Sequence, residues 1–521
     1  MKYLRPHTLG ALLSLVGGPA AAQDMMLACF NSTLDTAAKI LACDNAISQG
    51  NLPNDTLALA YASRGDARSQ SGNAIGALSD YDTALRMMPD DYAARIGRAQ
   101  VLENLNRPKD AEADYSIVIE RAPRTQEVLL GDAYTRRGAL RLEIGDTAAG
   151  IADLGEARRF DPRNPKPFKT RGAYFLRNGE AEQAALELEQ AVDLNAGDSE
   201  AQILLGSAQL QLGQSEAAVR AFTSALIVET DNVVALRGRA TAYGQLQNYG
   251  AAITDYTAAL NISGEDTASL EGRGAALLRV GAFAGATSDF DKLLEMNPND
   301  DSARFFRANA RFQSGDPTGA AADFSVILNR RPSDGDARVG RGIALQFTGD
   351  YKGAEADFTT VLESVPDAAQ ALANRGFTRI MKGDFAAAAE DLTAAMDLPN
   401  APPYLALWRY IAEARAKKPT TEILTFALER IDPGRWPAAI IRYFLGDASG
   451  DEIIAAAIDN PTGATGRLCE AYFFLGQAAL ILGDKTEAQR LFNAALNTAA
   501  VRYTEYAGAK AELARLKAIG D

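Results

Sequence analysis

The residues of this 521-residue chain that could do chemistry form a regular series, in which an acidic residue follows an arginine after 16 positions. In the stretch RGIALQFTGDYKGAEADFTTVL, residues 341–362, these two positions are Arg341 and Asp357. A carboxylate among apolar residues can act as a general acid or base, or it can accept the planar fork of an arginine. The nine pairs of the series are Arg64 and Asp80, Arg98 and Asp114, Arg137 and Asp153, Arg171 and Glu187, Arg239 and Asp255, Arg273 and Asp289, Arg307 and Asp323, Arg341 and Asp357, and Arg375 and Asp391.

A tenth segment has Leu205 and Ala221 at the two positions, so both charges are missing together. This joint change predicts that the two residues of each pair are in contact and partly buried. The alternative is that both are solvated and recur only because the segment was duplicated. In either case we predict a structural role, because a carboxylate that arginine neutralises is a poor general acid.

An enzyme that works with carboxylates alone, such as a glycosidase, is the alternative from another functional class. It would need two unpaired acids facing one cleft at about 5 to 9.5 Å, whereas the acids of the series are repetitive and paired. The only histidine, His7, lies in a predicted leader, so the mature chain has no Ser-His-Asp or Cys-His catalysis. We therefore expect no enzyme activity, no metal, no cofactor and no small-molecule substrate.

The first 22 residues, MKYLRPHTLGALLSLVGGPAAA, have the order of a secretory signal peptide, with Lys2 and Arg5 before an apolar stretch. We expect cleavage after Ala22 and a periplasmic or secreted mature chain without a membrane span. That mature chain has 51 basic and 67 acidic residues, a formal charge of −16. This charge argues against nucleic acid and anionic membrane surfaces as partners.

Two of the three cysteines, Cys29 and Cys43, lie near the predicted mature N-terminus. We predict a disulfide between them, which would close a loop of about 15 residues and stabilise by roughly 3 kcal/mol. The alternative is two buried thiols, as we predict for Cys469. Cys29 follows MLA, and Asp24 separates it from the apolar run, which departs from a lipoprotein signal. A lipid-anchored scaffold would instead begin at an acylated Cys29.

The series belongs to an internal repeat with a period of 34 residues and one step of 39. Each unit has a small anchor residue after the arginine, a second small residue 12 positions on and an aromatic or leucine four positions further, as in Gly342, Ala354 and Phe358. Gly349 predicts the end of a first helix and Asp350 the cap of a second. We therefore expect a helical hairpin in which the anchor faces the second small residue. The anchors are Gly65, Ala99, Gly138, Gly172, Gly206, Ala240, Gly274, Ala308, Gly342 and Gly376.

This pattern resembles the tetratricopeptide repeat (TPR) family over residues 58–402, in ten repeats. The resemblance implies an all-α, right-handed superhelical solenoid with a concave peptide-binding surface. Spacing alone predicts a helical solenoid whose units cannot bury their apolar faces singly. The family often has leucine at the position that arginine occupies in this series.

In the TPR family a groove is lined by the first helix of each hairpin, at positions −3, +1, +4 and +5 from the anchor. The resemblance therefore implies a site for a peptide with hydrophobic anchors. The alternative is that some of these positions belong to the core and that the C-terminal tail covers them. The family's carboxylate clamp for chaperone C-termini is absent. The implied groove residues are Arg237, Phe305, Asn309, Phe312, Ile343, Phe347, Phe377 and Met381.

The two ends of the chain depart from the period. Residues 23–57 predict a diverged capping hairpin, and residues 403–521 predict a helical region with one further hairpin at about 469–502 and a capping helix. The C-terminal region, with Trp436-Pro437 and EAYFFLG, resembles NlpI-type bacterial TPR adaptors, which are periplasmic lipoproteins. We expect a protein-binding scaffold or adaptor in envelope protein assembly or in the regulation of cell-wall enzymes.

Overall fold

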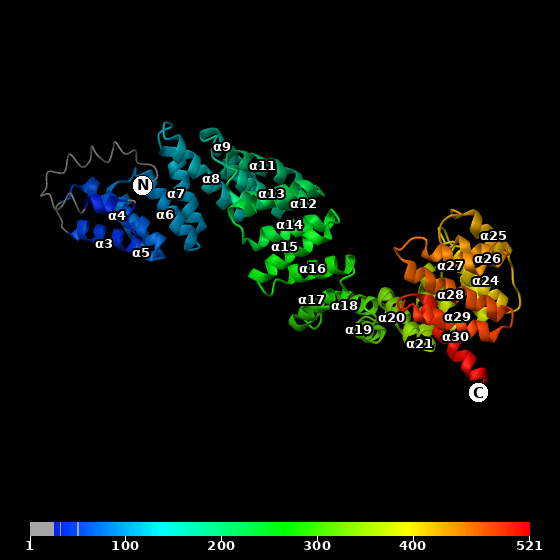
Figure 1. Cartoon of the computed structure of the whole chain (residues 1–521). Helices are drawn as coiled ribbons and strands as arrows, with labels where there is room; N and C mark the ends of the chain where they lie inside the picture. The colour runs from blue at the N-terminus through cyan, green and yellow to red at the C-terminus, as the bar shows by residue number, and fades with distance from the viewer. Residues whose placement is uncertain (1–25, 32, 49–51, 521) are drawn as a thin grey trace. The chain divides into compact units, whose positions relative to one another are not determined.

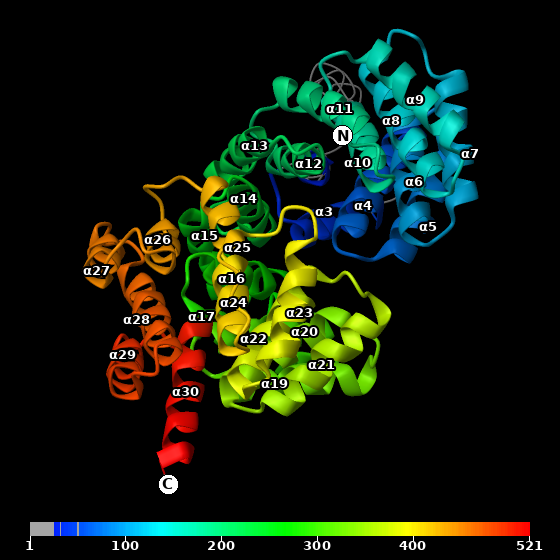
Figure 2. The same cartoon turned by 90° about the vertical axis from the view of Figure 1, so that its right-hand side faces the viewer.

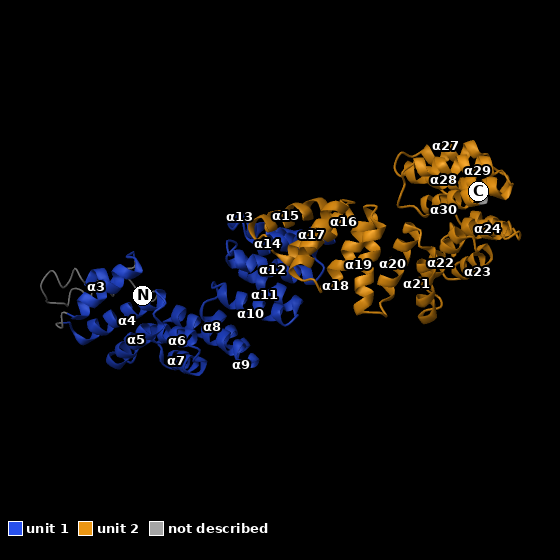
Figure 3. Ribbon diagram, turned by 90° about the horizontal axis from the view of Figure 1, so that it is seen from below, with its two compact units in different colours: residues 1–247 blue, residues 248–521 orange. Residues whose placement is uncertain are grey.

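The computed structural model describes residues 26–31, 33–48 and 52–520, and the predicted signal peptide lies outside them (Figure 1). Every regular element of these residues is a helix. None of these helices is long and apolar enough to cross a membrane. The chain divides into two compact units, residues 1–247 and 248–521 (Figure 3), and each is described by itself.

The first unit is a row of helical hairpins that follows the predicted period. A short helical stretch over residues 26–30 precedes α3. Its helices are α3 (Thr36–Ser48), α4 (Asn54–Gln70), α5 (Ala74–Met87), α6 (Tyr92–Asn104), α7 (Pro108–Arg121), α8 (Glu127–Glu143), α9 (Thr147–Phe160), α10 (Lys166–Arg177), α11 (Ala181–Leu194), α12 (Ser199–Gln211), α13 (Ser215–Val228) and α14 (Val233–Gln245).

The second unit continues the hairpins and then leaves the period. Its repeat helices are α15 (Tyr249–Ile262), α16 (Thr267–Arg279), α17 (Phe283–Met296), α18 (Asp301–Gln313), α19 (Pro317–Arg330), α20 (Gly335–Thr348), α21 (Tyr351–Ser364), α22 (Ala369–Lys382) and α23 (Phe385–Met396). The C-terminal helices are α24 (Leu405–Arg415), α25 (Glu422–Glu429), α26 (Ala438–Leu445), α27 (Gly450–Ile458), α28 (Ala464–Ile481), α29 (Lys485–Asn497) and α30 (Thr504–Gly520).

The turn inside each hairpin has the predicted chemistry. Gly349 ends α20 with φ of 91°, and the carboxylate of Asp350 accepts a bond of 2.9 Å from the backbone N–H of Gly353. Asn106 and Gln247 reach the same left-handed region, at φ of 57° and 58°, so a non-glycine residue serves in two repeats. The carboxylate of Asp384 makes no such capping bond, although its repeat has the same sequence pattern.

The anchors face two kinds of neighbour. A Cβ atom on Gly138 would lie 3.0 Å from the backbone oxygen of Gly150, so in this repeat the anchor faces the second small residue as expected. A Cβ atom on Gly342 would lie 2.8 Å from the ring of Phe358, so the anchor faces this aromatic residue rather than Ala354. Gly65, Gly206 and Gly274 face the aromatic ring of their own second helix in the same way. The small anchor therefore makes room for a large side chain that fills the hairpin.

The C-terminal helices of the second unit fold back onto its last repeat. Trp408 of α24 is fully buried, and its ring centroid lies 4.7 Å from that of Phe377 on α22 and 5.1 Å from that of Phe473 on α28. Helix α30 contacts α20, α22, α28 and α29 (Figure 2). The last repeat is therefore enclosed between its neighbours and the C-terminal region.

Candidate functional site

The arginine and the acid of each repeat meet between the two helices of one hairpin. Arg341 of α20 donates from Nε to Oδ2 of Asp357 on α21 at 2.8 Å and from Nη2 to Oδ1 at 2.7 Å. Asp357 is only 4% exposed. The bidentate geometry uses the planar fork of the guanidinium fully, which makes the pair a strong charge-assisted contact.

We call the full series of these pairs the ladder. The Arg171–Glu187 pair is looser, with a single contact of 3.2 Å. Arg239 and Asp255 fall in different units. The bidentate pairs within the units are Arg64–Asp80, Arg98–Asp114, Arg137–Asp153, Arg273–Asp289, Arg307–Asp323, Arg341–Asp357 and Arg375–Asp391.

Eight of the nine ladder arginines also reach back to the preceding hairpin, a contact that sequence reasoning missed. Arg171 is the exception because the acceptor position before it is Gly155. Nη1 of Arg307 donates to Oδ1 of Asp291 on α17 at 2.7 Å, and Nη1 of Arg375 donates to the hydroxyl of Thr359 on α21 at 3.2 Å. The acceptor lies 17 residues after the preceding anchor, where the chain repeatedly has Asp, Ser or Thr. That recurring polar position was the signal available in the sequence. One guanidinium thus joins three helices.

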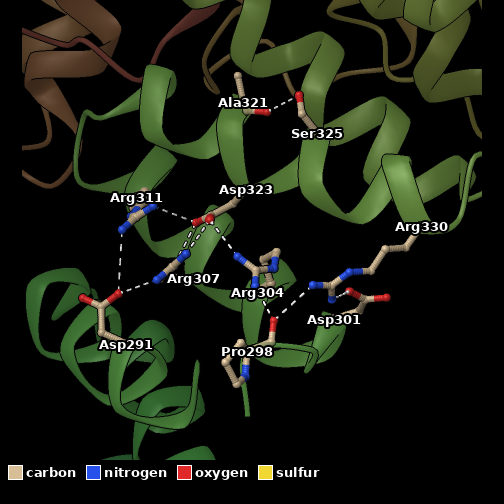
Figure 4. A network of polar contacts seen from close by, with 10 residues as sticks. All are labelled: Asp291, Pro298, Asp301, Arg304, Arg307, Arg311, Ala321, Asp323, Ser325 and Arg330. Carbon is tan, nitrogen blue, oxygen red and sulfur yellow. Dashed lines mark hydrogen bonds and ion pairs between the residues drawn. The ribbon is translucent and has the colours of Figure 1, made fainter. Parts of the chain in front are cut away.

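Further arginines surround the most highly coordinated carboxylate (Figure 4). Asp323 accepts from Arg307, from Nη1 of Arg311 at 2.9 Å, and lies 3.7 Å from Nη1 of Arg304. Arg304 in turn donates to the backbone carbonyl of Pro298 at 2.6 Å. Both oxygens of Asp323 are therefore engaged by cations.

Electrostatics of the ladder follow from this geometry. Hydrogen bonding to Asp357 raises the pKa of Arg341 and outweighs the opposing effect of burial. Burial lowers the pKa of Arg307, but bonds to Asp323 and Asp291 leave it raised above its ordinary value. Arginine is protonated in proteins at all ordinary pH values, so the ladder is suited to holding helices and not to proton transfer.

The other predicted site residues lie on the first helices of the repeats. Phe305, Asn309 and Phe312 of α18 are half-buried, as are Ile343 and Phe347 of α20. The rings of Phe312 and Phe347 meet edge to face with centroids 5.0 Å apart. We call these five residues the first-helix face. Asn309 is polar, and the other four are partly exposed apolar side chains on two neighbouring repeats of the second unit. Phe347 also packs against Met381, Ala507 and Ala511.

The profile of the family described as tetratricopeptide repeat matches residues 63–124, 169–233, 203–269, 271–337 and 339–404, which together make up more than half of the chain. The chain belongs to the tetratricopeptide repeat family. A second tetratricopeptide repeat profile matches residues 470–500, the hairpin of α28 and α29.

Solved TPR structures resemble parts of the chain. A TPR protein from Parabacteroides merdae is 23% identical over 48% of this chain and 98% of its own, with a TM-score of 0.36. The C-terminal part of a TPR protein from Cytophaga hutchinsonii is 17% identical over 53% of this chain and 97% of its own, with a TM-score of 0.36. YrrB, described as a TPR protein with an unusual peptide-binding site, is 21% identical over 38% of this chain and 99% of its own, with a TM-score of 0.32.

Two residues of the expected TPR groove lie in the interior instead. Phe377 is 9% exposed and packs on Trp408, and Met381 is 3% exposed beneath Ala507 and Ala511 of α30. The cause is the C-terminal region, which covers the first helix of the last repeat. These two positions are therefore part of the core in this structure and offer no free surface.

Arg237, the remaining predicted groove residue, is half-buried on α14. This helix belongs to the first unit, whereas the first-helix face belongs to the second.

The TPR array begins with a disulfide between Cys29 and Cys43. Both cysteines are fully buried, and the hydroxyl of Ser63 on α4 donates to the backbone carbonyl of Cys29 at 2.8 Å. The disulfide thus holds the N-terminal helical stretch and α3 together and against the first hairpin. Cys469 is a free buried thiol, and burial raises its pKa to about 11.

Proposed function

We propose that this chain is an exported scaffold that binds a protein or peptide segment on its first-helix face. The observation that carries this proposal is that Phe305, Phe312, Ile343 and Phe347 are all partly exposed on α18 and α20, with the rings of Phe312 and Phe347 in contact. Large apolar side chains that stay partly exposed side by side mark interaction surfaces. Asn309 adds a polar group among them, as peptide-binding surfaces require for orientation.

We place the function in an oxidising compartment, in the periplasm or outside the cell. The disulfide supports this location, because such bonds persist where thiols are not kept reduced. The sulfur of Cys29 is bonded to that of Cys43, so Cys29 has no free thiol to carry an acyl chain. This favours a cleaved form that starts at Gln23 over a lipid-anchored form. An adaptor role in envelope protein assembly or cell-wall enzyme regulation rests on the resemblance of the C-terminal region.

The proposed organisation assigns residues 23–57 to a cap, residues 58–402 to the repeats that present the surface, and residues 403–521 to a region that closes their C-terminal end. The ladder takes no part in catalysis in this proposal, because its carboxylates are already occupied by arginines. We propose no reaction for the chain.

Site-directed photo-crosslinking in living cells tests the proposal. A photoreactive phenylalanine analogue at Ile343 should capture a partner protein, because this half-buried apolar position belongs to the first-helix face. The matched control is the same analogue at Glu363, an exposed position on the second helix α21. Adducts at position 363 with none at 343 would overturn the assignment of the surface.

The double variant Phe312→Ser and Phe347→Ser provides the second arm. It should abolish the adduct formed at position 343, because it removes the two rings that meet edge to face. The control Phe426→Ser changes an aromatic residue of α25 that is 51% exposed and should leave the adduct intact. An adduct that survives the double variant would mean that the partner binds elsewhere.

A further inference from the structure

One pocket of the second unit lies between α16, α17 and α18, and its lining residue Phe306 contacts Phe305 of the first-helix face with ring centroids 6.0 Å apart. Its volume is about 280 Å³, which is enough for one long side chain. The floor is the fully buried ring of Phe290, and Met296 and Phe306 form apolar walls. Glu271 and Asp300 supply carboxylates to the same pocket.

The pocket arises from a local departure from the repeat. Two positions before the anchor, the following repeat has Gly340, where a Cβ atom would lie 2.5 Å from the ring of Phe324. At the matching position of its own repeat, Phe306 stacks on Phe290 with ring centroids 5.7 Å apart. Phe306 is 36% exposed, so part of this ring faces outward. The ring of Phe306 therefore forms a wall of the pocket at the position where the following repeat has a glycine packed directly against Phe324.

The carboxylates of the pocket make fewer hydrogen bonds and ion pairs than those of the ladder. Glu271 is exposed and makes no hydrogen bond or ion pair with any residue that the structure describes. Asp300 uses Oδ1 to accept the backbone N–H of Ala303 at 2.9 Å, which leaves its second oxygen. A cation that enters the pocket would meet carboxylates and aromatic rings together.

At two other places in the chain, an arginine side chain contacts both an aromatic ring and a carboxylate. The guanidinium of Arg158 lies 4.0 Å above the ring of Phe168 and 3.4 Å from the carboxylate of Glu187. In the second unit, Arg415 lies 4.4 Å above Phe385 and 3.0 Å from Glu512. A carboxylate beside an aromatic face is therefore a combination that binds guanidinium in this protein.

We propose that the pocket formed by Glu271, Phe290, Met296, Asp300 and Phe306 binds the side chain of an arginine supplied by the protein partner. The apolar walls contact its methylene stem, the exposed part of the Phe306 ring stacks on the flat face of the guanidinium, and the carboxylates accept its N–H groups. Arginine fits better than lysine because it can stack and form a bidentate bond at once. The proposal rests on the proposed scaffold function and names one chemical feature of the partner.

The test uses the full chain and small probes of one side chain. Nα-acetylarginine N-methylamide should bind in the millimolar range in ligand-observed NMR titrations, and the neutral isostere Nα-acetylcitrulline N-methylamide should bind about tenfold more weakly. Glu271→Gln should weaken arginine binding about fivefold, and so should Phe306→Gly, which copies the closed geometry of the next repeat. The exposed loop variant Glu265→Gln should change nothing.

Equal affinity for the arginine and citrulline probes would overturn the proposal, and so would an affinity that Glu271→Gln leaves unchanged. A lysine probe that binds more tightly than arginine would overturn the choice of side chain. Crosslinking at Ile343 keeps the two proposals separate. If the adduct at position 343 forms normally while no probe binds, the pocket proposal fails and the scaffold proposal stands.

Discussion

At the scale of single residues, a ladder arginine such as Arg307 works as a junction between three helices. Arg307 binds Asp323 in its own hairpin and Asp291 in the preceding one. Burying these charges costs desolvation energy, so the pair gives little net stability over an apolar replacement of the same shape. Removing only one partner lowers stability, because it leaves an unpaired charge in the interior. The ladder should therefore be sensitive to single substitutions and tolerant of paired ones.

Arg341→Leu is the direct test of this asymmetry. It should lower the free energy of unfolding by about 3 kcal/mol, because Asp357 stays buried with only Arg338 nearby, at 3.4 Å. Adding Asp357→Ala should recover part of this loss, and chemical denaturation measures both variants. Arg331→Leu is the control, since Arg331 is 53% exposed and its pairs should contribute less than about 1 kcal/mol. A double variant no more stable than Arg341→Leu would refute the pairing.

Glu505, in the first turn of α30, should make the free energy of unfolding depend on pH. It is 3% exposed, its Oε1 has no hydrogen-bond partner among the described residues, and burial raises the pKa of its carboxyl to about 7. Because this value lies above that of the unfolded chain, the folded state binds the proton more tightly. The contribution of the Glu505 carboxyl to the stability of the folded state therefore falls as the pH rises from about 4.5 to about 7, and it is constant above about pH 7.

Glu505→Gln removes this titration. The variant should exceed the natural protein in free energy of unfolding by up to about 3 kcal/mol at about pH 8, and by less at about pH 5.5. Denaturant midpoints at the two pH values measure the difference. Glu363→Gln, which changes an exposed residue of α21, should give the same difference at both. A pH-independent gap between Glu505→Gln and the natural protein would contradict the predicted titration.

At the scale of elements, the hairpins and the pairs of the ladder could be predicted because each signal recurs in register. Gly349 and Asp350 mark one turn, and Arg341 with Asp357 mark one contact, at the same offsets as their counterparts in other repeats. The burial of Met381 could not be predicted in this way. It depends on Arg515 and its neighbours, more than 130 residues away in a region without the period. A single contact between distant segments leaves no repeating signal.

Substitution of Arg515 tests which contacts hold α30 on the last repeat. Nη2 of Arg515 donates to the backbone carbonyls of Ile380 and Met381 at 3.1 and 2.6 Å, which caps the end of α22, and its Nη1 bonds to the buried carboxylate of Glu512. Arg515→Ala should speed amide exchange in α30 and in the last turn of α22, because it removes charge-assisted bonds worth about 2 kcal/mol.

Arg490→Ala is the matched control for α30. Arg490 is 66% exposed and pairs with Glu487 only one turn away on α29, so its loss should leave exchange in α30 and α22 unchanged. Equal exchange rates in α30 for Arg515→Ala and the natural protein would show that apolar packing of Ala507 and Ala511 holds the helix without the cap.

At the scale of the whole molecule, most contacts join helices that are neighbours in the sequence, and α30 with α20 and α22 is the main exception within the second unit. The stability of such an array is a sum over hairpins and the interfaces between them. A terminal hairpin has one interface instead of two, so it opens most easily. The C-terminal end of the repeats is enclosed by α24 to α30, and the N-terminal end has the disulfide between Cys29 and Cys43.

Reduction of that disulfide should therefore act locally and at the N-terminal end. The double variant Cys29→Ser and Cys43→Ser should lose roughly 3 kcal/mol of protection in α3 and the start of α4, because the open loop regains its conformational freedom in the unfolded chain. Hydrogen exchange resolved by segment measures the loss, and α28 and α29 should keep their natural rates because repeats transmit stability only through shared interfaces. Cys469→Ser, which changes a buried thiol of α28, is the control and should alter the C-terminal helices alone. Uniformly faster exchange along the whole chain after reduction would show that the array opens as one cooperative unit, and the nearest-neighbour description would then be wrong.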